Sequence, residues 1–266
     1  MLNDITLGQF YPINSIIHRL DPRIKIFLTV LLIVFLFTAK NFYGIAVMAL
    51  VCVVAVIASR IPVGYILKSF KPLLFIIIFT CLLNLFLTDG TIIFHYGFIK
   101  VTHEGVYSAI FMVARLSLLI ITTNLLTLTT SPILLTDGLE HLMSPLKIIK
   151  FPAHEIAMMM TIAMRFIPTL LEETDKIIKA QSARGADFGS GNILNKAKAM
   201  IPILIPLFIS AFRRADELAL AMECRLYSGG EKRTRMRQLR VKGIDIIAVV
   251  FTLTASTAVV ALNVLL

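Results

Sequence analysis

The sequence predicts an all-α membrane protein with about five transmembrane helices and long amphipathic helices between the fourth and the fifth. The 266 residues are 58% hydrophobic and have a mean hydropathy of +0.86, which is too apolar for a water-soluble domain. Five apolar runs approach the length of about 20 residues that a bilayer-crossing helix needs. Between the fourth and fifth runs, apolar and charged residues are mixed.

The five predicted spans are distributed unevenly, with four before the middle of the chain and one at its end. They cover residues 24–39, 42–59, 72–88, 109–130 and 244–264. Only Lys40 and Asn41 separate the first two, which predicts a tight helical hairpin. Asp21 before Pro22 is typical of a helix start, because Asp accepts from free amides and Pro tolerates the first turn. Residues 89–108 have mixed polarity and are expected to include a short β-hairpin.

The amphipathic part of the chain consists of three predicted helical segments at the cytoplasmic membrane face. They are residues 132–150, 153–184 and 192–225. Proline is expected to end the first segment and to kink or break the other two, because it lacks an N–H and clashes with the preceding turn. These prolines are Pro145, Pro168, Pro202 and Pro206. The prediction therefore has three regions: a membrane region 1–130, a cytoplasmic region 131–242 and a final span 243–266.

The distribution of basic residues predicts the orientation of the spans. Six Lys or Arg flank the first span or follow the second: Arg19, Arg23, Lys25, Arg60, Lys68 and Lys71. Lys40 and Lys100 are the two basic residues in the opposite connections, whereas residues 131–243 carry 17. By the positive-inside rule the N-terminus is cytoplasmic, and five spans place the C-terminus outside. The net charge of +10 is thus a topology signal and does not indicate nucleic-acid binding.

The sequence lacks the usual marks of catalysis, cofactor binding or metal binding. It has no phosphate-binding loop, no zinc-protease helix motif, no nucleophile elbow and no cysteine pair with zinc spacing. Cys52, Cys81 and Cys224 do not indicate a disulfide framework. Ionisable groups are scarce in the spans, and Arg115 fits helix packing better than a proton relay. A self-sufficient secondary transporter and a membrane-embedded enzyme stay open as alternatives, although each would need polar groups that are not evident.

Two stretches that end predicted helices share an unusual spacing. They are "QSARGADF", residues 181–188, and "AMECRLYSGG", residues 221–230. Arg184 and Arg225 each follow an aspartate by nine positions and an alanine by four. An arginine in the last turn interacts favourably with the carbonyl end of a helix, and Gly185 suits a left-handed cap. That local explanation fits Arg225 less well, because Leu226 follows it.

These features resemble the transmembrane T component, EcfT, of energy-coupling factor transporters, which are ABC-type importers of vitamins and trace metals in prokaryotic cell membranes. The resemblance is carried by "ITLGQFYPINSIIHRLDPRIK", residues 5–25, and by two Ala-Arg-Gly-type motifs, and it covers essentially the whole chain. The first motif is Ala183, Arg184 and Gly185. The second aligns with Cys224, Arg225 and Leu226 and keeps only the arginine, which puts its backbone geometry in question.

The resemblance implies a non-catalytic coupling subunit. Its two helix ends would dock on two cytoplasmic ABC ATPase subunits, A and A′, which bind and hydrolyse ATP, so the chain needs no cofactor or metal of its own. The motion would reach a membrane-embedded substrate-binding S component. Four methionines are candidates for an adaptable S-component contact or for ordinary core packing: Met158, Met159, Met160 and Met164. A T component of a cobalt or nickel importer is an alternative within the family.

Overall fold

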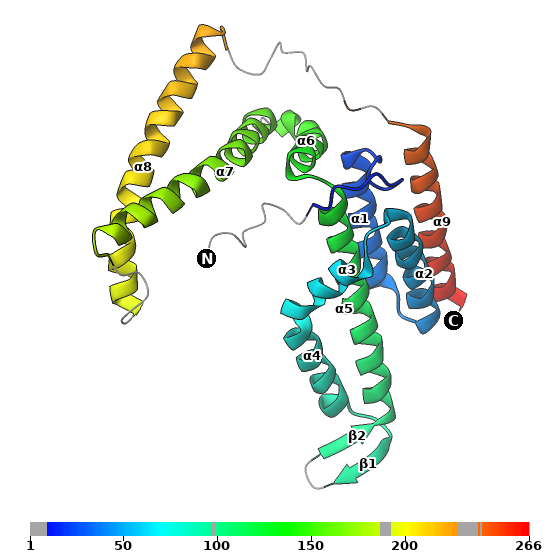
Figure 1. Ribbon diagram of the computed structural model, residues 1–266. Coiled ribbons are helices and arrows are strands. Elements are labelled where there is room, and N and C mark those ends of the chain that lie inside the picture. The colour runs from blue at the N-terminus through cyan, green and yellow to red at the C-terminus, as the bar shows by residue number, and fades with distance from the viewer. Residues whose placement is uncertain are drawn as a thin grey trace. The chain divides into compact units, whose positions relative to one another are not determined.

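Helices form most of the computed structural model, which describes residues 10–96, 99–149, 151–186, 193–227, 239 and 241–265. Figure 1 traces these helices along the chain. The chain divides into two compact units. We call them the bundle unit, which comprises Gly8–Leu142 and Leu239–Leu266, and the crossed-helix unit, which is built on Met143–Gln238.

The bundle unit holds the apolar helices and one small sheet. Its elements are α1 (Pro22–Thr38), α2 (Phe42–Ser59), α3 (Val63–Phe70), the 3-10 turn η1 (Lys71–Leu73), α4 (Leu74–Leu87), β1 (Ile92–Tyr96), β2 (Ile99–Thr102), α5 (His103–Thr129), α6 (Pro132–Met143) and α9 (Gly243–Leu265). The two strands pair antiparallel, so the predicted hairpin is confirmed. All membrane-length elements are α-helical, and the all-α membrane class is confirmed as well.

The candidate spans match the predicted runs closely. Among the described residues, four helical stretches are long and apolar enough to cross a membrane: α2, Val63–Leu87, α5 and α9. The third predicted run is thus part of a longer stretch that includes α3, η1 and α4. The first predicted run corresponds to α1, whose 17 residues lie at the lower end of the length that can span a bilayer.

The core of the bundle unit lies where α1, α2, α5 and α9 meet. Leu36, Met48 and Val259 are fully buried there. Gly44 allows the close approach, because a Cβ at this position would lie 3.3 Å from the Ala39 Cβ and 3.5 Å from Val259 Cγ1. Small residues of this kind let membrane helices pack backbone to backbone, where dispersion forces replace the hydrophobic effect as the driving force.

Arg115 braces the corner between α1 and α2 from its place on α5. Its guanidinium donates a 2.6 Å hydrogen bond to the Ala39 carbonyl and lies 4.6 Å from the centroid of the Phe111 ring. The carbonyl of Ala39 belongs to the turn between the two helices, where no intrahelical donor is available. These contacts favour the packing interpretation of Arg115 over a proton relay.

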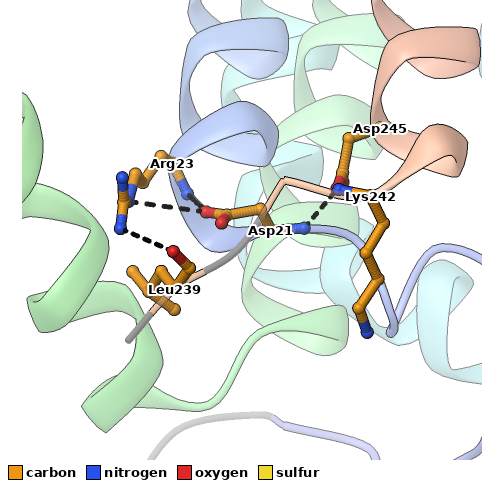
Figure 2. A network of polar contacts seen from close by, with 5 residues as sticks. All are labelled: Asp21, Arg23, Leu239, Lys242 and Asp245. Atoms are coloured by element: carbon orange, nitrogen blue, oxygen red, sulfur yellow. Dashed lines mark hydrogen bonds and ion pairs between the residues drawn. The ribbon is translucent and has the colours of Figure 1, made fainter. Parts of the chain in front are cut away.

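The start of α1 is tied to the start of α9 by a network of carboxylates and backbone amides (Figure 2). As predicted, Asp21 caps α1, since its Oδ1 accepts a 2.9 Å hydrogen bond from the Arg23 amide. The amide of Asp21 in turn donates to Asp245 Oδ1 at 2.8 Å. Asp245 Oδ2 accepts from the Lys242 amide at 2.6 Å, which is half of a capping box at the start of α9.

Lys25, one turn into α1, holds the end of α5. Its Nζ donates to the Thr129 carbonyl at 2.9 Å and to Thr130 Oγ1 at 3.2 Å. The lysine is buried, with 6% of its surface exposed. A buried ammonium group is costly unless it is paired, and here the end carbonyls of α5 and the nearby carboxylates of Asp21 and Asp245 compensate it.

The crossed-helix unit contains two long helices that cross each other in Figure 1. Its elements are the 3-10 turn η2 (Ser144–Ile149), α7 (Ala153–Ala183) and α8 (Ile193–Cys224). Pro145 lies in the 3-10 turn that follows α6, as expected. The other prolines do not break their helices, because α7 continues through Pro168 and α8 through Pro202 and Pro206. Each proline removes one hydrogen bond, and the many remaining bonds of a helix this long preserve it.

We predict that Lys25→Met destabilises the bundle unit. The substitution removes the donor for Thr129 and Thr130 and leaves two buried carboxylates with less compensation, so the free energy of unfolding should fall by about 1.5–3 kcal/mol. Thermal unfolding in detergent measures the change. Lys40→Met is the control, because this lysine is exposed and should change stability by less than about 0.5 kcal/mol. Equal losses in the two variants would contradict the prediction.

Candidate functional site: two arginine-tipped helix ends

The C-terminal ends of α7 and α8 have the same hydrogen-bond pattern. At the end of α7, the amides of Gly185 and Ala186 donate to the carbonyls of Ser182 and Gln181, both at 3.0 Å. At the end of α8, the amide of Leu226 donates to the Glu223 carbonyl at 2.8 Å, and that of Tyr227 to the Met222 carbonyl at 3.0 Å. Both sets are the paired bonds of a Schellman motif. The two ends are therefore one structure built twice, 41 residues apart.

The residue after each arginine adopts a left-handed conformation. Gly185 has φ +90°, as predicted for a glycine cap. Leu226 has φ +54°, although a leucine there costs roughly 1–2 kcal/mol because its Cβ approaches the following carbonyl. The departure from Ala-Arg-Gly at the second motif thus leaves the backbone geometry intact. The two Schellman bonds hold Leu226 in a conformation that its side chain disfavours.

Arg184 and Arg225 occupy equivalent places at these ends, and both are exposed. Within the part of the chain that the structure describes, neither guanidinium makes a hydrogen bond or an ion pair. Ala183 and the free thiol of Cys224 are also exposed. A guanidinium presents five donors in a planar fork that suits carboxylates and carbonyl groups. Each helix therefore ends in an exposed cation next to a rigid cap, and this cation is unpaired among the described residues.

The exposed side chain of Leu226 adds an apolar group to the second end. It has 89% of its surface exposed, whereas Gly185 offers no side chain at the equivalent position. The two ends thus share a backbone and a charge but differ in shape. Such a pair can bind two surfaces that are similar without being identical.

The two residues of the ion pair that joins α7 to α8 are also 41 positions apart in the sequence. Arg214 on α8 donates to Glu173 on α7 at 2.7 Å, and both side chains are partly buried. Sequence reasoning missed this pair, although the signal was available: Glu173 lies 11 residues before Arg184, and Arg214 lies 11 residues before Arg225. Partial burial weakens solvent screening, so this pair is worth more than a typical surface salt bridge.

A cavity of about 310 Å³ lies beside this ion pair, between α7 and α8. Its walls are mainly apolar. The lining residues are Ile162, Phe166, Leu170, Ala211, Arg214, Ala215, Leu218, Ala219 and Met222. Among the described residues, the crossing is thus joined by the Glu173–Arg214 ion pair and by apolar side chains around this cavity.

The four predicted contact methionines lie in the first half of α7. Met159 is exposed, with 58% of its surface accessible, and Met158, Met160 and Met164 are half-buried. Ala153 and Ala157, and not the methionines, are the buried residues of this helix. The structure therefore places the methionines at the margin of the packed face, where part of each side chain stays accessible.

Residues 200–212 of α8 expose a row of large apolar side chains, which we call the α8 apolar face. Its members are large side chains that are mostly accessible: Met200, Ile201, Leu204, Ile205, Phe208, Ile209 and Phe212. Contiguous apolar surface of this extent marks a site for another protein or for lipid. Within the part of the chain that the structure describes, these side chains are exposed.

Comparison with known proteins gives a consistent match. The family model described as cobalt transport protein, CbiQ, matches residues 13–236. An energy-coupling factor transporter transmembrane protein EcfT from Ruminiclostridium cellulolyticum is 55% identical over 99% of this chain and 98% of its own. EcfT from Thermosediminibacter oceani is 54% identical over 94% of this chain and 95% of its own. EcfT from Bacillus subtilis is 48% identical over 92% and 93%.

We predict opposite stability effects for reciprocal substitutions at the two caps. Leu226→Gly removes the cost of a left-handed leucine and should stabilise the end of α8 by about 1 kcal/mol, whereas Gly185→Leu should destabilise the end of α7 by a similar amount. Hydrogen exchange at the amides of Tyr227 and Ala186 measures the two ends separately. Slower exchange after both substitutions, or faster exchange after both, would contradict the left-handed caps.

Proposed function

The chain belongs to the CbiQ and EcfT family of transporter transmembrane proteins, and we propose that it is the subunit that couples ATP hydrolysis to transport. In this proposal two cytoplasmic ABC ATPase subunits bind the ends of α7 and α8. A membrane-embedded S component binds the substrate. This chain connects them and does no chemistry itself.

One observation carries the proposal: two long helices end in the same rigid cap, each with an exposed arginine that has no partner among the described residues. A cap with two backbone hydrogen bonds fixes the direction of the arginine stem, so little conformational freedom is lost on binding. The guanidinium fork then binds a carboxylate or helix-end carbonyls on the ATPase. Two such ends suit a pair of related ATPase subunits that bind ATP between them.

The connection between the two helices supports a mechanical role. Glu173 and Arg214 join α7 to α8 at 2.7 Å, about 11 residues before each tip. A displacement of either tip is therefore opposed or shared by the other helix. ATP is bound by the partner subunits in this proposal, consistent with a sequence that has no phosphate-binding loop.

The exposed apolar surfaces of the crossed-helix unit support contact with the S component. The α8 apolar face is too large to be left in water, and the methionines of α7 lie at the edge of a packed surface. Methionine is flexible and polarizable, so it adapts to different partner surfaces. We propose that the S component covers the α8 apolar face and contacts Met158, Met159, Met160 and Met164.

The arrangement of the bundle unit supports a cytoplasmic N-terminus and an extracellular C-terminus. Asn263 near the end of α9 accepts from the Lys40 amide at 3.2 Å and donates to the Thr38 carbonyl at 2.8 Å, so α9 ends where α1 ends. At the opposite ends of these helices lie Asp21 and Asp245, near several basic residues. The positive-inside rule assigns that more basic side to the cytoplasm.

We propose vitamins or related micronutrients as the transported class. A cobalt or nickel importer is the second candidate, because the matching family model is described as a cobalt transport protein. The S component selects the substrate in either case. Purification of the complex from native membranes, followed by identification of the S protein, distinguishes the two: a vitamin-binding S protein supports the first and a metal-binding one the second.

We predict that Arg184→Ala and Arg225→Ala each weaken binding of the ATPase subunits. Loss of one partner from a buried charged contact typically costs about 2–5 kcal/mol. Less ATPase should therefore copurify with the tagged variant, and ATP-driven uptake should fall. Expression and membrane insertion should be unchanged, since neither side chain has an intrachain contact among the described residues. Arg→Lys should also impair binding, because lysine cannot reproduce the planar fork.

Arg213→Ala is the matched control for these variants. Arg213 is an exposed arginine of α8 that pairs with Glu217 one turn away, at 3.6 Å, and it lies 12 positions before the tip. Its loss should leave copurification and uptake at the level of the unaltered protein. Normal uptake by the Arg184→Ala, Arg225→Ala double variant would refute the proposed role of the tips.

We predict that replacing the four methionines with leucine and valine reduces binding of S components. Branched side chains of similar volume fold equally well, within about 1.5 kcal/mol, but they adapt less to a partner surface. Copurification of the S components from native membranes measures the effect. Met112→Leu on α5 is the control for methionine content. Full binding of every S component by the four-residue variant would contradict the contact.

A further inference from the structure

The first turn of α1 contacts both segments through which the chain passes between the two units. The chain leaves the bundle unit after Leu142, at the end of α6, and returns to it at Leu239, before α9. Both of these segments touch the residues from Asp21 to Ile26. The contacts lie entirely within the bundle unit and are independent of how the two units sit relative to each other.

The departing segment is held by direct packing of α6 on α1. Gly138 of α6 is buried, and a Cβ at this position would lie 3.1 Å from Ile26 Cδ1 and 3.3 Å from the Pro22 carbonyl carbon. These distances are shorter than ordinary van der Waals contact, so a side chain here would push α6 away from α1 by a few tenths of an ångström or displace Ile26. Glycine therefore allows the observed approach without displacing Ile26 or α1.

The returning segment is held by hydrogen bonds (Figure 2). The Asp245 carboxylate has none of its surface exposed and accepts from the amides of Asp21 at 2.8 Å and Lys242 at 2.6 Å. Arg23 reaches the Leu239 carbonyl at 3.4 Å. One carboxylate thus joins the start of α1 to the segment that leads into α9, through short charge-assisted hydrogen bonds.

Lys25 extends the same contact to the segment that precedes α6. Its Nζ donates to Thr129 and Thr130, immediately before α6 begins. Two positive side chains, Arg23 and Lys25, accompany the two buried carboxylates of Asp21 and Asp245, so the cluster is balanced in charge. These hydrogen bonds favour one geometry of the cluster, because each charge is costly without its partners; among the described residues, Asp21 Oδ2 and Arg23 Nε are buried without a hydrogen-bond partner.

We propose that the first turn of α1, Asp21–Ile26, is the anchor through which movement of α7 and α8 reaches the membrane-spanning helices, with Gly138 and Asp245 as its positioning residues. This inference rests on the proposed coupling function. Movement of the crossed-helix unit can reach the bundle through the two covalent connections, and both are fastened to the same turn. Displacement of either connection therefore displaces α1, which packs against α5 and α9.

Helix capping alone would also explain the hydrogen bonds, so the test needs a readout that stability does not change. We suggest hydrogen exchange of the complex, purified from native membranes through a tag on this chain, with and without a non-hydrolysable ATP analogue. In the unaltered complex the analogue should change exchange in α7 and α8 and also at the starts of α1 and α9. Anchor variants should keep the first response and lose the second.

Asp245→Asn and Gly138→Ala test the two attachments separately. Asparagine offers one acceptor where two amides need partners, and alanine separates α6 from α1 while favouring the helix itself. The nucleotide response of α1 and α9 should fall by about tenfold, within the usual range of coupling between sites. Glu104→Gln and Gly64→Ala are the controls, because Glu104 binds the Thr91 amide at the opposite end of α5 and Gly64 has open space around it.

A second substitution provides a rescue. Ile26→Val removes the Cδ1 atom nearest to the added methyl group of Gly138→Ala, so the double variant should regain part of the response in α1 and α9. A variant that only weakens a cap would not be rescued in this way. If Asp245→Asn fails to assemble, the Gly138→Ala and Ile26→Val pair decides the question by itself.

An unchanged response of α1 and α9 in both anchor variants, with the ATPases still bound, would overturn the anchor and leave the coupling function standing. Lower thermal stability with an unchanged response would have the same meaning. Failure of the ATPases to copurify with the unaltered chain would instead refute the coupling function. The two failures are therefore distinguishable in one set of experiments.

Discussion

A helix leaves its first N–H groups and its last C=O groups without partners inside the helix, and this requirement positions most of the charged side chains discussed here. In a bilayer the requirement is strict, because no water is present to satisfy the end groups. Asp21 and Asp245 accept from the amides at the starts of α1 and α9, and Lys25 donates to a carbonyl at the end of α5. Arg115 does the same at the turn after α1. The Asp21 carboxylate caps only α1, whereas Asp245, Lys25 and Arg115 each join two elements, so the satisfaction of helix ends also helps to hold the bundle unit together.

The ends of α7 and α8 solve the same problem differently. Their carbonyls are satisfied by their own backbone, through two Schellman bonds each. The arginines at these ends are therefore not needed as caps, and their guanidinium groups stay available for another molecule. The left-handed Leu226 supports this interpretation, because a residue that costs free energy in the folded chain persists where the surrounding bonds or a function require it. A charged side chain that caps a helix end is occupied by that contact. Where the backbone itself caps the end, a nearby charged side chain stays exposed.

Local sequence patterns predicted the elements and failed on contacts between distant residues. The five apolar runs, the cap at Asp21 and the left-handed Gly185 follow from periodicity and from residue preferences within a few positions. Asp245 and Asp21 are 224 positions apart, and nothing local to either residue indicates the pair. The left-handed conformation of Leu226 was unexpected, because leucine disfavours it and a prediction from sequence relies on residue preference. In the folded helix end, the two Schellman hydrogen bonds outweigh that preference. Of the kink or break predicted at the prolines of α8, the break does not occur, because helical and tertiary context preserves the helix through both prolines.

The coupling role proposed above requires stiffness along one path and freedom elsewhere. Two sets of contacts among the described residues fit that requirement: the Glu173–Arg214 pair joins α7 to α8, and the residues around Asp21 contact the segments next to both connections of that unit. The α8 apolar face is neither charged nor internally paired, so it can move across a partner or lipid without breaking strong bonds. In the proposed coupling, charge and hydrogen bonds are concentrated at the crossing of α7 and α8 and at the start of α1, whereas the face proposed to contact the S component is apolar. That separation follows from how the two interactions depend on distance. A directional hydrogen bond is lost when its atoms move apart by about 1 Å or less. Apolar burial changes gradually with the area that is covered.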